Sequence, residues 1–165
     1  MRAASHQNLS QTWQANDLFV KMESGVKDTQ YNQNSMAYLR NLMDRKTCLP
    51  PASRVSTHRN VNGAVGAFNE TRKVAKDSPP ERVFSDGLNV YPRAMTYWRR
   101  KSKPEFVAKK GISKSHVNNN RIERLNWTLC EGVKVRRGWK NPASKILEEQ
   151  RIRYNFVKPH SVLEG

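Results

Sequence analysis

The residues of this chain that are best suited to chemistry are two acids in a strongly basic setting. Glu123 lies in the stretch NNNRIERLN, between Arg121 and Arg124. Asp86 ends a short apolar run in the stretch VFSDG. A carboxylate can bind a divalent cation, and a neighbouring guanidinium can bind a phosphate group. The two acids are therefore candidates for a metal site close to a phosphate-binding surface.

Each acid also has a purely structural interpretation. Glu123 follows Asn120 by three residues, which is the spacing of a helix capping box. Asp86 precedes Gly87, and aspartate is common where a strand enters a turn. Asp17, in the run WQANDLF, can be an ordinary surface acid on a strand. Taken alone, the residues leave the metal-binding and the structural interpretations open.

The composition limits the class of partner. The 165 residues make one domain's length, and 30 Lys and Arg against 14 Asp and Glu give a net charge of +16. This charge favours a polyanion, with nucleic acid as the leading candidate. A membrane partner is disfavoured because no apolar run has spanning length. The start MRAASHQNLSQTWQ lacks the apolar core of a secretory signal, so we expect a cytoplasmic location.

Two cysteines occur, and they suggest no shared site. Cys48 and Cys130 lie in unlike surroundings, and the chain contains no CxxC pair. We therefore expect two buried or incidental thiols, and neither a disulfide framework nor a zinc site.

Hydrophobic periodicity predicts a mixed sheet. Residues 13–22 and 37–43 are expected to form two strands joined by a long polar hairpin. A third strand is expected around 48–55, where Pro50 and Pro51 restrict it to a sheet edge or a break. A fourth short strand should pass through Val83 and Phe84 and end at Asp86.

Helices are predicted between and after these strands. Asn60 should cap a helix that Gly63 and Gly66 weaken. A short helix should follow the fourth strand, and a further strand and two helices complete the order. The last helix should begin at Asn141 and Pro142. The residues expected to face inward are Val61, Ala64, Val65, Phe68 and Ala75; Tyr91, Ala94 and Tyr97 or Trp98; Ile122, Leu125, Leu129 and Val133; and Ala143, Ile146, Leu147 and Tyr154.

Several separated stretches point to one family. They are, in order, FSDGLNVYPRAM, HVNNNRIERLNWTL, VKVRRGWKNP and IRYNFVKPHSVLEG, with TWQANDLFVK, MAYLRNLMDRKT and GAVGAFNETRKVA upstream. Together they resemble the catalytic core of DDE-type insertion-sequence transposases of bacteria and archaea. The resemblance covers residues 12–165 and implies an α/β, RNase H-like fold of the integrase type, a mixed sheet flanked by helices. Residues 1–11 would be a short extension, without a separate helix-turn-helix domain.

The resemblance also implies a reaction and the residues for it. Such cores cut phosphodiesters and transfer strands at transposon ends, with two Mg²⁺ or Mn²⁺ ions held by three acids. Asp86 matches the second acid and Glu123 the third. Asn16 occupies the position of the first acid, and Asp17, which follows it, is a possible substitute if the strand register shifts by one residue. Because a strand alternates its faces, we expect Asp17 to point away from the site, and activity to be reduced in a shortened, partly degenerate copy.

The same resemblance suggests DNA contacts and a second copy of the chain as a partner. A non-catalytic basic protein, either a decayed transposase fragment or a ribosomal-type RNA binder, is the alternative, and its basic clusters would then serve charge-driven binding alone or be solvated faces. The location implied is the prokaryotic cytoplasm, at the nucleoid. The residues predicted to contact the phosphates of transposon ends and target DNA are Arg99, Arg100, Lys101, Lys103, Arg121, Arg124, Lys134, Arg136, Arg137 and Lys140.

Overall fold

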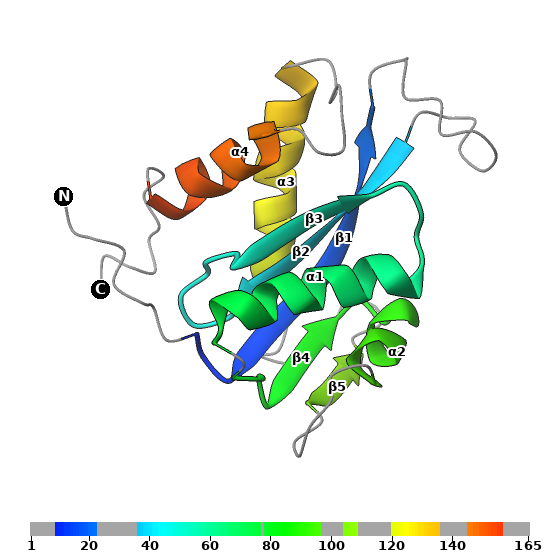
Figure 1. Cartoon of the computed structure of the whole chain (residues 1–165). Helices are drawn as coiled ribbons and strands as arrows, with labels where there is room; N and C mark the ends of the chain where they lie inside the picture. The colour runs from blue at the N-terminus through cyan, green and yellow to red at the C-terminus, as the bar shows by residue number, and fades with distance from the viewer. Residues whose placement is uncertain are drawn as a thin grey trace.

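The computed structural model describes residues 9–22, 36–76, 78–96, 104–108, 120–135 and 145–156, which form five strands and four helices (Figure 1). The strands are β1 (Thr12–Lys21), β2 (Met36–Asp44), β3 (Ala52–Ser56), β4 (Arg82–Ser85) and β5 (Glu105–Ala108). The helices are α1 (Val61–Val74), α2 (Val90–Thr96), α3 (Asn120–Val135) and α4 (Lys145–Phe156). None of the described helices is long and apolar enough to cross a membrane.

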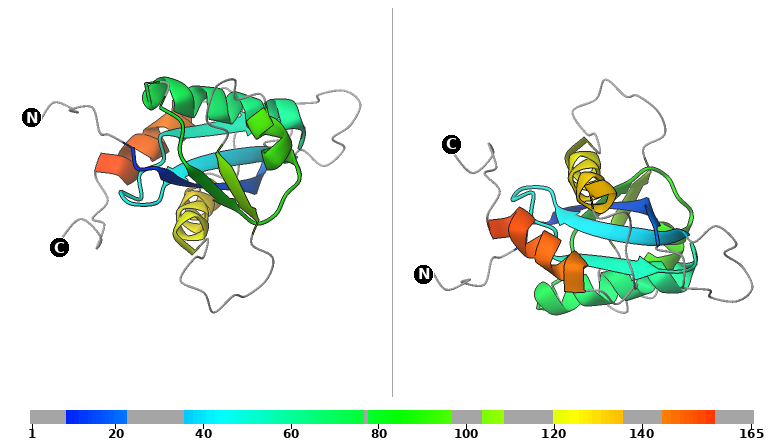
Figure 2. Two further views of the ribbon diagram at one scale, coloured as in Figure 1. Left: turned by 90° about the horizontal axis from the view of Figure 1, so that it is seen from below. Right: turned by 90° about the horizontal axis from the view of Figure 1, so that it is seen from above.

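The strands form one mixed sheet in the order β3-β2-β1-β4-β5. The pairs β1–β2 and β2–β3 are antiparallel, and the pairs β1–β4 and β4–β5 are parallel. The end views show α1 and α2 on one side of the sheet and α3 on the other (Figure 2). The central strand β1 is therefore covered on both faces.

Alternation along the strands divides the core into two layers. Trp13 and Ala15 of β1 pack with Phe68 of α1 and Tyr91 of α2. Val20, five residues after Ala15 and so on the opposite face of the strand, packs with the α3 layer instead. The sheet side chains in the α3 layer also include Leu39 and Met43 of β2, and the helical ones include Ile122, Leu125 and Leu129, as predicted.

The two prolines act as the sequence indicated. Strand β3 starts at Ala52, directly after Pro50 and Pro51, and lies at the edge of the sheet. Arg151 of α4 donates to the carbonyl oxygens of both prolines, at 3.4 Å each. The prolines therefore precede the strand, where their missing N–H groups interrupt no ladder.

Helix α1 packs its predicted face against the sheet and also buries small residues beside that face. Asn60 caps the helix as expected, accepting from the Gly63 N–H at 2.9 Å. Ala64 and Phe68 are buried as predicted, and Val61, Val65 and Ala75 are half-buried and pack against the same cluster. The residues buried in addition are Gly63, Ala67 and Thr71. The helix uses small residues because arginines of the sheet lie beneath it: a Cβ at Gly63 would collide with the guanidinium of Arg40, and one at Gly66 would lie 2.6 Å from Nε of Arg54.

Helix α4 completes the α3 layer. Leu147 and Tyr154 are buried in the same cluster as Leu129, as the periodicity predicted. The predicted start at Asn141 and Pro142 lies outside the described residues, as do Tyr97, Trp98 and Ala143, and nothing is described of the Val133 side chain. Cys48 is buried and Cys130 is half-buried, and the two form no disulfide with each other.

Candidate functional site

The first candidate position, Asn16, lies in the middle of the central strand. Its side chain is on the α3 side of β1, in phase with Leu18 and Val20, and the residue is only 9% exposed. The parallel ladder between β1 and β4 ends with Ala15 opposite Ser85. Asn16 and Asp86 are the next residues along the two chains, one position beyond this last pair.

A tight turn holds Asp86 at the carboxyl end of β4. Its Oδ1 accepts a hydrogen bond from the Leu88 N–H at 3.2 Å, and the Ser85 hydroxyl accepts one from Gly87 at 3.1 Å. Gly87 has φ of 91°, a conformation that side-chain-bearing residues rarely adopt. This turn requires the glycine and fixes the backbone on both sides of the acid.

Glu123 lies in the first turn of α3 and is exposed. Three residues later, buried Asn126 accepts a hydrogen bond from Nδ2 of Asn41 at 2.6 Å. Asn41 is the cross-strand neighbour of Asn16 in the antiparallel ladder. Residues three apart on a helix share a flank. Glu123 therefore lies one turn before Asn126, on the same flank of α3. The three candidate positions thus lie on β1, directly after β4 and on α3, and the β1–β2 ladder with the Asn41–Asn126 hydrogen bond connects β1 to the turn of α3 that follows Glu123.

The remaining flank of α3 faces α4. Burial raises the pKa of Tyr154 on α4, the Cys48 thiol raises it further, and the positive charge of Arg124 counteracts this in part. A helix turns by about 100° per residue, so residues two apart point in nearly opposite directions. Glu123 and Trp127 are each two residues from Leu125, which packs in the cluster shared with α4, and they therefore lie on the other side of α3. Trp127 is 65% exposed on this open flank.

Asp17 lies on the opposite face from Asn16, as strand alternation predicts. Its carboxylate accepts two hydrogen bonds from Arg59, from Nε at 2.7 Å and from Nη2 at 2.9 Å. The Asp17 side chain is only 2% exposed, and its hydrogen bonds raise the pKa of Arg59. The guanidinium of Arg59 also lies 5.4 Å from the ring centroid of Phe19. Asp17 is therefore committed to an ion pair on the α1 side.

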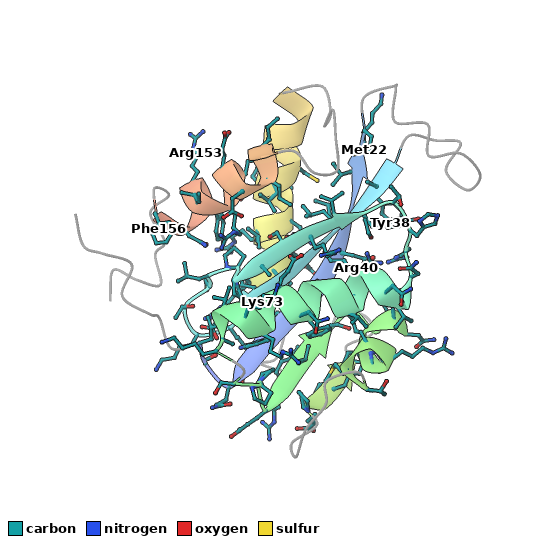
Figure 3. All side chains as sticks on the ribbon, in the orientation of Figure 1. Met22, Tyr38, Arg40, Lys73, Arg153 and Phe156 are labelled. Atoms are coloured by element: carbon teal, nitrogen blue, oxygen red, sulfur yellow. The ribbon has the colours of Figure 1, made fainter. Side chains whose placement is uncertain are left out.

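A second arginine sits beneath α1, where Figure 3 labels it between the helix and the sheet. Arg40 is 1% exposed, and this burial lowers its pKa. It donates to the hydroxyl of Ser56 and to the carbonyl oxygens of His58 and Asn60, the latter two at 3.3 Å. Arg40 thus joins β2 to the entry of α1.

Sequence reasoning missed Asn41, Asn126, Arg40 and Arg59. One signal was present: the predicted strand MAYLRNLM places Arg40 and Asn41 side by side in an otherwise apolar run. Two adjacent polar residues in a strand covered on both faces indicate buried hydrogen bonding on each side. Arg59 and Asn126 have no comparable signal, because both lie in polar surroundings in the sequence.

The donors at the candidate site suit one hard cation. No group of three or more His, Cys, Asp and Glu side chains that could hold a metal ion occurs within the described ranges. Asp86 and Glu123 supply carboxylate oxygens, and Asn16 supplies an amide. Mg²⁺ accepts such oxygen ligands together with water. The set fits a single divalent ion and lacks the third carboxylate of a two-metal site.

The predicted DNA contacts are described only in part. Arg121 and Arg124 are exposed on α3, and Arg121 donates to the carbonyl oxygen of Arg45. Lys134 belongs to α3, but nothing is described of its side chain. The other predicted contacts lie outside the described residues; they are Arg99, Arg100, Lys101, Lys103, Arg136, Arg137 and Lys140.

Solved structures with a similar fold include retroviral integrases. The HTLV-2 integrase catalytic core, solved with magnesium in a trimeric form, has a TM-score of 0.60 and 11% identity over 93% of this chain and 90% of that one. The BIV integrase core has a TM-score of 0.57 and 12% identity over 94% and 92%. A chain of the simian T-cell lymphotropic virus intasome, in complex with PP2A regulatory subunit B56 gamma, has a TM-score of 0.56 and 12% identity over 94% and 52%.

No protein-family profile and no curated protein matches the sequence. The structural similarity nevertheless covers nearly the whole chain, and the five-stranded mixed sheet with its flanking helices is the one found in these integrase cores. The fold class predicted from the sequence, RNase H-like of the integrase type, is confirmed.

Proposed function

We propose that this chain, which has the RNase H-like fold of integrase catalytic cores, acts on DNA as a polynucleotidyl transferase core of the insertion-sequence transposase kind, with residues 12–165 as the core. The observation that supports it is positional: Asn16 and Asp86 each follow the last pair of the β1–β4 ladder, and Asn41, the cross-strand neighbour of Asn16, bonds Asn126 one turn after Glu123. We place it in the prokaryotic cytoplasm, at the nucleoid, as a partly degenerate copy.

Asp86 and Glu123 would hold one Mg²⁺ or Mn²⁺ ion, with the amide oxygen of Asn16 as a neutral third donor. A divalent ion at such a site supplies positive charge that stabilises the phosphate oxygens during attack. Asn16 contributes no negative charge of its own, and Asp17 is engaged with Arg59 on the other face. Cleavage and strand transfer are therefore expected to be slow in the native chain.

The surface around the site is suited to DNA. The net charge of +16 favours a polyanion, and Arg121 and Arg124 are exposed on either side of Glu123 in sequence. The exposed ring of Trp127, one turn beyond Glu123, can stack on an unpaired base near a distorted DNA end. The trimeric form of the HTLV-2 core and the intasome of the simian virus support a working assembly of several copies on DNA.

Restoring the first acid tests this proposal. Asn16→Asp adds a carboxylate beside Asp86, and Mn²⁺ affinity, measured by calorimetry, should rise at least tenfold, which needs only about 1.4 kcal/mol. Glu123→Gln in that background should abolish the gain and any metal-dependent nicking of a matched DNA end. Asp17→Asn is the matched control and should leave the Mn²⁺ affinity unchanged. If the native chain binds two Mn²⁺ ions as tightly as the Asn16→Asp variant, the assignment of Asn16 as the weak position is wrong.

The neutral residue at position 16 also supports a second candidate, a non-catalytic protein that binds nucleic acid through charge alone. Such binding falls with salt and does not depend on a divalent metal. DNA binding that is identical in Mg²⁺ and in EDTA, with no nicking by the Asn16→Asp variant, would favour this candidate.

A further inference from the structure

The α3 side of the sheet contains a buried amide cluster that the catalytic resemblance does not explain. Asn16, Asn41 and Asn126 are 9%, 0% and 7% exposed, and they come from β1, β2 and α3. Asn16 and Asn41 are cross-strand neighbours, and Asn41 donates to Asn126 at 2.6 Å. A buried amide in a central strand costs stability compared with an aliphatic side chain unless all its polar atoms are bonded.

One atom of this cluster has no bonding partner. Oδ1 of Asn41 is buried and accepts no hydrogen bond from any described residue. The hydrogen bond from Nδ2 to Asn126 fixes the plane of the amide, so Oδ1 is its free corner, on the sheet face that also contains Asn16. A free acceptor in this position calls for a donor or a cation.

We infer that Asn41 supplies an amide oxygen to the cation held by Asp86 and Glu123, and that Asn126 positions it. This inference rests on the proposed function. Amide oxygens belong to the hard ligand set of Mg²⁺ and Mn²⁺. A second neutral oxygen beside Asn16 partly offsets the missing carboxylate, because it adds a ligand without adding charge. The hydrogen bond from Asn41 also ties β2 to the helix turn that follows Glu123.

Asn155 provides a matched control for this role. It lies on α4, donates to the carbonyl oxygen of Pro50 at 3.5 Å, and also has a buried Oδ1 without a partner among the described residues. Asn41→Leu should lower the Mn²⁺ affinity of the full chain about tenfold, and Asn41→Asp should raise it about tenfold. Asn155→Leu and Asn155→Asp should leave it unchanged.

An NMR titration of the native chain tests the same role without relying on variants that could fail to fold. Titration with Mg²⁺ should shift the side-chain ¹³Cγ resonance of Asn41 in step with the Cδ resonance of Glu123, while the ¹³Cγ resonance of Asn155 stays in place. If Glu123 responds and Asn41 does not, Asn41 is only a structural amide and the inference fails alone. If neither responds up to millimolar Mg²⁺, the metal site of the proposed function fails as well.

Discussion

The two faces of the β1–β2 pair solve the burial of polar groups in opposite ways. On the α1 face, the cross-strand neighbours Asp17 and Arg40 are charged, and Arg59 adds a two-point ion pair. On the α3 face, the next pair along the same strands, Asn16 and Asn41, is neutral. Adjacent residues of the same two strands therefore belong to different networks: Asp17 and Arg40 to the charged one under α1, and Asn16 and Asn41 to the amide cluster under α3.

The comparison assigns different roles to the two faces. On the α1 face, Asp17 binds Arg59, and Arg40 donates to a hydroxyl and two carbonyl oxygens at the entry of α1. Such groups hold the sheet and helix together. Nε of Arg40 and the hydroxyl of Tyr91 are buried there without a partner among the described residues. The amides under α3 include an acceptor without a partner among the described residues, beside the positions that resemble a catalytic triad. Both faces thus contain an unpaired polar atom, and the difference between them is chemical: the groups under α1 are charged donors and a carboxylate held in an ion pair, whereas the groups under α3 are neutral amides that can offer an oxygen to a ligand.

The largest effect is expected from breaking the charged face. Arg59→Met leaves the 2%-exposed Asp17 carboxylate without its two hydrogen bonds. Loss of one partner from a buried pair costs roughly 3 kcal/mol, at the lower end of the usual range because Arg59 is partly exposed. Urea unfolding of the native and variant chains measures this loss of unfolding free energy.

Asp17→Asn in the Arg59→Met background provides the matched control, because it removes the unpaired charge while keeping the shape. We expect it to recover part of the lost stability. A loss of less than about 1 kcal/mol for Arg59→Met alone would instead be typical of a surface ion pair. In that case the α1 face would not be the supporting one.

A smaller effect concerns Tyr91, which α2 inserts beneath α1. Its hydroxyl is buried without a partner among the described residues, and burial raises its pKa well above 10, with the nearby Asp17 charge adding to the rise. Above about pH 10 the unfolded chain loses this phenolic proton while the folded chain keeps it, so stability should fall as the pH rises. Tyr91→Phe should be neutral or stabilising by up to about 1 kcal/mol near pH 7, because it removes an unpaired polar group.

The difference between the native chain and Tyr91→Phe should therefore widen between pH 9 and pH 11, as followed by thermal unfolding. Lysines also titrate there, but they contribute equally to both chains and cancel in the difference. A constant difference across this range would show that the Tyr91 hydroxyl ionises as readily in the folded chain as in the unfolded one.

Much of this architecture was predictable from the sequence. The strands around Asn16 and Asn41, the edge position after Pro51, and the Asn60 cap follow from local patterns of apolar, proline and capping residues. The role of Gly63 and Gly66 in α1 was not predictable, because it depends on Arg40 and Arg54 from distant strands lying against them. The amide cluster was hidden for the same reason: the Asn41–Asn126 bond joins residues 85 positions apart.

The smallest effect tests whether the basic surface near the amide face contacts DNA. Each phosphate contact contributes about 0.9 to the slope of log K against log salt on duplex DNA, so Arg121→Gln with Arg124→Gln should lower the slope by up to about 1.8. Neutralising Arg99, Arg100 and Lys101 together removes up to three contacts, so this variant should lower the slope of the native chain by up to about 2.7. Arg153→Gln, an exposed change on α4 (Figure 3), is the control and should leave the slope as it is.

The comparison of the two faces expects the ligand at the flank of α3 that bears Glu123. Equal slopes for the Arg121/Arg124 and Arg153 variants would mean that DNA does not approach this flank. The charge near Glu123 would then be only a solvated surface. Filter binding at several salt concentrations, at constant Mg²⁺, separates these outcomes.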